Sequence, residues 1–195
     1  EGVTALPEDQ QTLIDPKISF ANDRTTLSYT LPVFVAGMNT NNEALEVHAD
    51  GQNNNFIGAC GTTGGYSFHQ LYGSFGVTVK DPAPPQEATF REVALSGSLA
   101  EAAFQYRLNR NDAMANGADT ISIEYSCPGN VWVGVGVSEF GLMVPALAVT
   151  GSPEWGIPPA RVSLAARATE GVTALPEDQQ TLIDPKISFA NDRTT

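Results

Sequence analysis

Basic residues are scarce in this chain of 195 residues. It has 10 Lys and Arg against 22 Asp and Glu, which gives a formal net charge of −12. Proteins that bind nucleic acid or anionic membranes use clustered Lys and Arg, so this charge balance argues against both partners. No apolar run reaches 18 residues, and the sequence has no charged segment followed by an apolar segment of the kind found in signal peptides. We therefore expect neither membrane insertion nor a signal peptide within these residues.

Catalytic and metal-binding motifs are also missing. The sequence has no Gly-x-Ser-x-Gly elbow, no His-Glu-x-x-His pair and no phosphate loop. Its two histidines, His48 and His69, lack metal-ligand spacing. Adjacent carboxylates such as Glu8 and Asp9 would point to opposite faces of a strand, which suits joint acid-base work poorly. We expect a protein that is not an enzyme.

Cysteine is nearly absent, with Cys60 and Cys127 as the only two. An even count permits one disulfide in a secreted domain, and two buried thiols are the alternative. Sequence spacing does not show whether the two Cα atoms come within about 7 Å of each other. Both interpretations stay open at this point.

The clearest positive feature is an exact duplication. Residues 1–26 and 170–195 are the same string, EGVTALPEDQQTLIDPKISFANDRTT, so only 169 of the 195 residues are independent. Convergence does not produce such a match, so the segment was copied, either within a gene of tandem repeats or by deliberate design. A period of 169 residues is the size of one ordinary globular domain. A natural array would therefore resemble beads on a string.

Short apolar runs separated by turn residues predict a β-rich fold. The stretch VWVGVGVSEF alternates valines with Trp132, Gly134 and Gly136. Residues 21–24, Ala-Asn-Asp-Arg, join two apolar runs as a hairpin turn, and the Pro-rich residues 81–88 form a linker. Turns at roughly every 8 to 12 residues and about nine to eleven strands describe an all-β, antiparallel β-sandwich with little helix.

Three segments resemble the DOMON family, the sandwich of dopamine β-monooxygenase and of the cytochrome of cellobiose dehydrogenase. TISIEYSCPGNVWVGVGVSEFGLMVPALAVTG is similar to the first half of that domain, with Gly141 to Met143 as its Gly-x-Met turn. LPEDQQTLIDPKISFANDRTTLSYTLPVFV resembles the middle of the domain. NFIGACGTTGGYSFHQLYGSFGVTV resembles its end, where a His follows a Gly-rich strand, and His69 is that residue.

The two halves stand in the reverse of the family's order. Residues 1–80 match the second, His-bearing half, residues 89–169 match the first, Met-bearing half, and residues 170–195 begin the next repeat. The resemblance therefore implies that the boundaries of the repeat unit fall in the middle of a sandwich domain. Two copies of TLIDPKISF would compete for one strand position. One copy would complete the sheet of its own chain, and the other would be free or pair head to tail with a neighbouring molecule.

The resemblance also implies a haem b site. In the haem-binding members one Met and one His hold the iron, and Met143 and His69 stand at the matching positions. Thioether and imidazole ligands together favour reversible one-electron transfer. The other candidates are glycines that would let a flat ring approach the sheet and aromatic pocket walls, namely Gly134, Gly136, Trp132, Phe140, Tyr66 and Phe68.

Three functions follow from these observations. The first is a haem b electron-transfer domain repeated in an extracellular or cell-surface array, with neighbouring copies and a redox partner as its partners. The second is a haem-free structural or adhesive repeat, which the perfect repetition favours. A filament that holds haem in every bead combines these two and is the interpretation that we carry forward. A third function, carbohydrate binding, depends only on the aromatic residues Tyr66, Tyr72 and Trp155.

Overall fold

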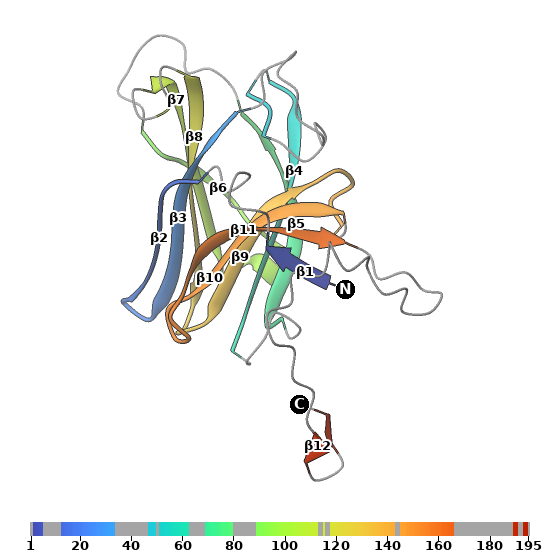
Figure 1. The fold of residues 1–195 in the computed structure, drawn as a ribbon. Helices are drawn as coiled ribbons and strands as arrows, with labels where there is room; N and C mark the ends of the chain where they lie inside the picture. The colour runs from blue at the N-terminus through green and yellow to red at the C-terminus, as the bar shows by residue number, and fades with distance from the viewer. Residues whose placement is uncertain are drawn as a thin grey trace.

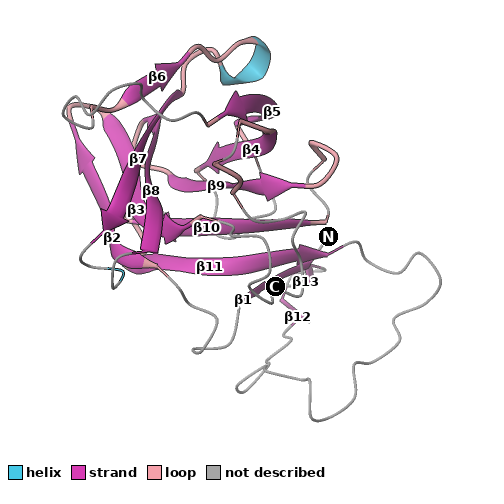
Figure 2. Ribbon diagram, turned by 90° about the horizontal axis from the view of Figure 1, so that it is seen from above, coloured by secondary structure: helices cyan, strands magenta, loops and turns pink. Residues whose placement is uncertain are grey.

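The computed structural model describes residues 2–5, 13–33, 47–49, 51–62, 69–79, 89–112, 115, 118–142, 145–165, 189–190 and 193–194. Most of these residues form two antiparallel sheets that pack face to face (Figures 1 and 2). The predicted all-β antiparallel sandwich is confirmed, and its eleven strands fall within the expected range. Within the described part of the chain, helix is limited to the 3-10 turn Gly97–Leu99 and to the single 3-10 residue at position 115.

The larger sheet has six strands in the order β1-β11-β10-β9-β4-β5. Their bounds are Gly2–Ala5 (β1), Ile157–Ala165 (β11), Ala146–Ser152 (β10), Trp132–Ser138 (β9), Asn53–Gly61 (β4) and Leu71–Thr78 (β5). The central strand β9 is buried along its whole length, so both faces of this sheet are covered at its middle.

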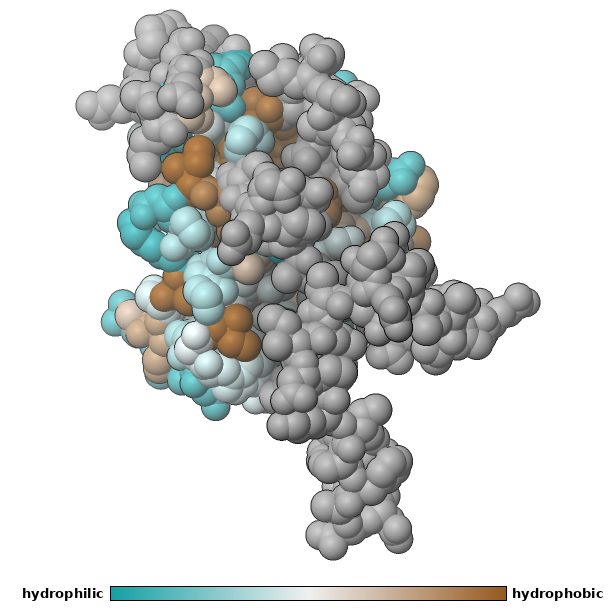
Figure 3. All heavy atoms as spheres, in the orientation of Figure 1, coloured by the Kyte–Doolittle hydropathy of each residue, from teal (hydrophilic) through white to brown (hydrophobic). Residues whose placement is uncertain are grey.

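The smaller sheet has five strands in the order β2-β3-β8-β7-β6. Their bounds are Ile14–Ala21 (β2), Arg24–Pro32 (β3), Ala118–Pro128 (β8), Ala103–Asp112 (β7) and Arg91–Val93 (β6). Strand β3 alternates buried and half-buried residues, as expected of a strand with one face on the core. Figure 3 shows hydrophilic and hydrophobic residues mixed on the side of the molecule where β2 and β3 lie.

The main core lies between the two sheets and is formed by alternate residues of the strands. Ile121, Ile123 and Tyr125 of β8 share the buried face. Phe56 from the larger sheet and Phe104 from the smaller one meet at this interface, with ring centroids 5.0 Å apart. Aromatic contacts of this kind bury large apolar areas and hold the sheets in register.

The hairpin between β2 and β3 follows the sequence prediction closely. Ala21 pairs with Arg24, which leaves a two-residue turn of Asn22 and Asp23. Their φ angles are 52° and 56°, the left-handed values that a type I′ turn requires and that Asn and Asp tolerate best. The predicted turn at residues 21–24 is confirmed.

Both halves of the repeat unit contribute to both sheets. Strands β1 to β5 come from residues 1–80 and strands β6 to β11 from residues 89–169, and the order of each sheet mixes the two sets. Residues 81–88, the predicted linker, lie outside the described residues. The two segments therefore close into one sandwich within this chain, while the placement of the domain boundary stays a prediction.

The duplicated segment forms a second, separate hairpin. Strands β12, Phe189–Ala190, and β13, Arg193–Thr194, pair only with each other, and Figure 1 shows β12 away from both large sheets. Phe189 faces Thr194 in the same register in which Phe20 faces Thr25 in the first copy.

Among the described residues no helix has the length and apolar character needed to span a bilayer.

Candidate functional site: a glycine-floored groove on the six-stranded sheet

The outer face of the six-stranded sheet carries a groove with an unusually flat floor. Gly134 and Gly136 of β9 face away from the main core, because the valines between them fill it. Gly134 pairs with Ala59 of β4, and Gly136 pairs with Ala148 of β10. Four small residues on three adjacent strands therefore keep this part of the sheet flat and free of large side chains.

The glycines of the floor are required for different reasons. A Cβ added at Gly136 would lie 2.2 Å from the carbonyl oxygen of Leu147 and 2.5 Å from Cα of Ala148. That distance is impossible without moving the backbone of β10. A Cβ at Gly134 would lie 3.0 Å from Cγ2 of Thr150, a side-chain atom. Gly136 thus permits the close approach of β9 and β10, whereas Gly134 mainly keeps the groove clear.

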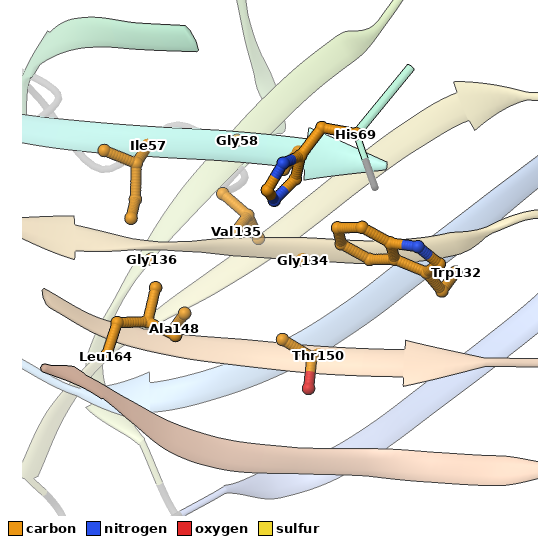
Figure 4. Close-up of a pocket in the computed structure, with 11 residues that line it drawn as sticks. Ile57, Gly58, His69, Trp132, Gly134, Val135, Gly136, Ala148, Thr150 and Leu164 are labelled. Carbon is orange, nitrogen blue, oxygen red and sulfur yellow. The ribbon is translucent and has the colours of Figure 1, made fainter. Parts of the chain in front are cut away.

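His69 lies over one end of this floor (Figure 4). Its position is fixed by the start of β5, since the backbone N–H of Gln70 donates to the carbonyl of Cys60 at 2.8 Å. The His69 ring meets the Trp132 indole edge-on, with ring centroids 5.4 Å apart, and its centroid lies 5.9 Å from that of Tyr72. These contacts hold a half-buried imidazole at the mouth of an apolar groove.

Other apolar side chains complete the walls. Ile57, Ala148 and Leu164 line the groove and belong to a second buried cluster that is separate from the main core. Thr150 also lines the groove, with its methyl carbon toward Gly134 (Figure 4). An apolar groove with few polar groups is the usual form of a small-molecule or cofactor site.

The side chains that line the groove suit a haem, but the volume of the groove is small for one. The His69 imidazole lies beside a floor of glycines, where an added Cβ would take up part of the space. This arrangement suits the edge of a flat, apolar ring. The cavity itself has a volume of about 40 Å³, whereas ligand pockets generally measure about 300–1,000 Å³. A porphyrin would therefore enter only if the groove widened.

Half of the predicted site residues gather at this groove. His69, Trp132, Gly134 and Gly136 all line it. Phe140 does not line it and is 65% exposed in the turn after β9. It was expected in the pocket wall, but the chain has left the sheet at that point. Tyr66, Phe68 and Met143 lie outside the described residues.

Sequence reasoning missed the residues that β4, β10 and β11 bring to the groove. Ile57 and Ala59 stand at alternate positions of β4, and Ala148 stands on β10. Their alternation marked each segment as a strand. Nothing in the sequence, however, indicated which strands are neighbours, so the shared face was not predictable from one segment at a time.

A second cluster of interest lies inside the main core. Cys60 of β4 and Cys127 of β8 are both buried, and their sulfur atoms are not bonded to each other. The two thiols interact directly across the core, and the Tyr125 ring lies beside them. The disulfide considered from the sequence stays a prediction, now with both partners placed face to face.

Two other surfaces are weaker candidates. Tyr72 is 56% exposed, but Trp155 is partly buried rather than exposed, which weakens the carbohydrate interpretation. A cavity of about 190 Å³ on the five-stranded sheet is lined by charges of both signs, including Lys17, Arg107 and Glu124. Its mixed charge favours no single class of ligand.

Three or more metal-ligating side chains of the His, Cys, Asp and Glu types do not gather anywhere among the described residues. Comparisons of the chain with family models, with curated proteins and with solved structures gave no match.

Proposed function

We propose that this chain is a repeat unit of an extracellular array that resembles a haem b DOMON cytochrome and binds haem in the groove of the six-stranded sheet. The observation that carries the proposal is the meeting of His69 with the glycine floor. His69 is separated by more than 60 residues from Gly134 and Gly136. The resemblance had nonetheless assigned all three to one site.

The residues of the groove have distinct roles in this proposal. His69 would supply an imidazole nitrogen to the iron, and the edge-on Trp132 ring would hold that imidazole in place. Gly134 and Gly136 would leave room for the ring, while Ile57 and Leu164 would exclude water from the groove. Met143 is the expected second ligand by resemblance to the family. Bound haem would supply reversible one-electron transfer.

A haem titration tests the proposal directly. The purified chain should develop a sharp Soret band that shifts on reduction, and His69→Ala should abolish or strongly weaken it. His48→Ala is the matched control, because it removes the only other histidine and lies outside the groove. A protein that stays colourless, or equal spectra for the two histidine variants, would refute the assignment.

A second variant separates the groove from the ligand. Gly134→Ala places a methyl group on the floor, where its closest contact would be Cγ2 of Thr150 at 3.0 Å. It should weaken haem binding by about tenfold or more, since overpacking of 1–3 kcal/mol is typical of such insertions. Its melting temperature should fall little, because the nearest atom belongs to a side chain that can turn away. Met143→Leu tests the second ligand in the same titration.

A haem-free repeat that assembles by strand exchange is the second candidate. A specific observation favours it: the duplicated hairpin forms with the register of β2 and β3 but pairs with neither sheet. The first copy already fills the edge positions of β1 and β2 in this chain. The second copy would then fill the same positions in the next molecule.

Matched substitutions in the two copies test this exchange. Ile18 packs against the core, and Ile187 is its counterpart in the copy. Ile18→Asp should favour head-to-tail assemblies, because the damaged strand yields its place to a neighbour's second copy, whereas Ile187→Asp should stay monomeric. Light scattering over a range of concentrations measures the difference. Strict monomers for the parent and for both variants would exclude exchange.

A further inference from the structure

The two cysteines face each other across the sandwich from opposite sheets. Cys60 is the penultimate residue of β4, and Cys127 is the penultimate residue of β8. Both side chains belong to the main core and are essentially inaccessible to solvent, with exposures of 1% and 0%. The pair therefore lies at one end of the sandwich, where both strands end together.

A second contact fixes the alignment of these two strands independently. Two residues before the cysteines, a Cβ built on Gly58 would lie 2.7 Å from Oη of Tyr125. Gly58 thus faces Tyr125 as Cys60 faces Cys127, because residues two apart on a strand share a face. The absence of a side chain at Gly58 lets β8 approach β4 closely. That approach brings the sulfur atoms within reach of each other.

The ionisation of the two thiols agrees with direct contact. The interaction with Cys127 lowers the pKa of Cys60, and the positive charge of Arg24 acts in the same direction. The same interaction, together with burial, raises the pKa of Cys127. In the folded protein Cys60 is therefore the thiol that carries negative charge more readily, as expected of two thiols in contact.

We propose that Cys60 and Cys127 form an inter-sheet disulfide when the folding chain meets a small-molecule disulfide oxidant. The bond fastens β4 of the six-stranded sheet to β8 of the five-stranded sheet. It also joins the two halves of the repeat unit, since β4 lies in residues 1–80 and β8 in residues 89–169.

The chemistry is an ordinary two-step exchange. In the unfolded chain the thiolate of either cysteine attacks one sulfur of the oxidant, forms a mixed disulfide and releases one small thiolate. The other cysteine then gives its proton to that thiolate and attacks the protein sulfur of the mixed disulfide, and the second small thiolate that leaves takes up the proton that the first cysteine had lost. Two protein thiols and one small disulfide thus become one protein disulfide and two small thiols. Both sulfurs are buried in the finished fold, so the exchange takes place before β4 and β8 have packed together.

Refolding with glutathione tests the proposal. The full chain is reduced, unfolded in guanidinium chloride and refolded with excess oxidised glutathione, and free thiols are then counted by maleimide labelling under denaturing conditions. The expected product is a monomer with no free thiol, no glutathione adduct and a mass lower by two hydrogens. Its melting temperature should exceed that of the reduced protein by about 5 to 15 °C, from the usual effect of one disulfide on a domain of this size.

Single variants provide the control. Cys60→Ser and Cys127→Ser should each keep one thiol that ends free or as a glutathione adduct, and their melting temperatures should not respond to the oxidant. Cys→Ala at the same positions replaces them if serine prevents folding. Two reactive thiols in the oxidised parent protein, two glutathione adducts, or disulfides formed only between molecules would each overturn the proposal.

Discussion

The buried hydroxyl of Thr25 offers a sharp test of which copy of the duplicated segment completes the sandwich. Thr25 is 0% exposed. Its Oγ1 donates to the carbonyl of Gly129 at 2.8 Å and accepts from the backbone N–H of Val131 at 3.1 Å. The side chain thereby ties the first copy to the turn between β8 and β9. Thr194 is the same residue in the second copy, within the same local sequence.

Thr25→Val keeps the shape of the side chain and removes both hydrogen bonds. A buried group that loses its partner costs about 1–3 kcal/mol, so the loss of two partners should destabilise the fold by about 2–6 kcal/mol. For a domain of this size that corresponds to a fall in melting temperature of about 4 to 24 °C. Thr194→Val should change the melting temperature by about 1 °C or less, because substitutions outside the packed fold usually have small effects.

Thermal unfolding followed by circular dichroism, at one pH and one protein concentration, measures both variants. The two substitutions change the same residue in the same sequence, so intrinsic strand propensity cancels in the comparison. Equal falls for Thr25→Val and Thr194→Val would show that the copies exchange places. No fall for Thr25→Val would refute the structural role assigned to its hydroxyl.

Three further predictions follow from the packing and the buried ionisable groups. Gly58→Ala should lower the melting temperature by several degrees, because its Cβ would lie 2.7 Å from Tyr125 Oη, and Tyr125→Phe should restore part of the loss in a double-mutant cycle. Gly136→Ala should prevent stable folding or lower the melting temperature more than Gly134→Ala, because its Cβ would collide with backbone atoms of β10. Burial raises the pKa of Tyr29 above its usual range, which the charge of Arg161 partly offsets. Above pH of about 10 the unfolded chain releases this proton and the folded protein keeps it, so stability is complete below that pH and should fall by up to about 1.4 kcal/mol per pH unit above it. Melting curves from pH 8 to 11 should show a shallower decline for Tyr29→Phe, and identical declines would contradict this assignment.

Most of the local structure was predictable from the sequence because successive side chains of a β-strand alternate between its two faces. The alternation of valines with Trp132, Gly134 and Gly136 marked one face for the core and one for the outside, and the structure has this arrangement. The turn at Asn22 and Asp23 was equally clear, since few residues accept left-handed φ angles. Each of these signals lies within about ten residues.

The pairing of distant strands was not predictable in the same way. Nothing in the sequence of β4 indicated that it lies between β5 and β9, or that Cys60 would face Cys127. Those contacts depend on how all eleven strands share one core, and many strand orders satisfy the same alternation. The resemblance assigned His69 and the two glycines to one site, whereas the walls that β10 and β11 add to the groove were not predicted.

The pairing of β1 with β11 has a mechanical consequence. The two strands are antiparallel edge neighbours, and Gly2 lies opposite Ala165. The chain thus enters and leaves the sandwich at the same end of one ladder. In an array of such units, tension would act at this one end of the ladder. It would break the hydrogen bonds between β1 and β11 one after another, rather than load all of them at once in shear. The β1 edge would yield first and act as an extensible joint, while the core between the two sheets stayed closed.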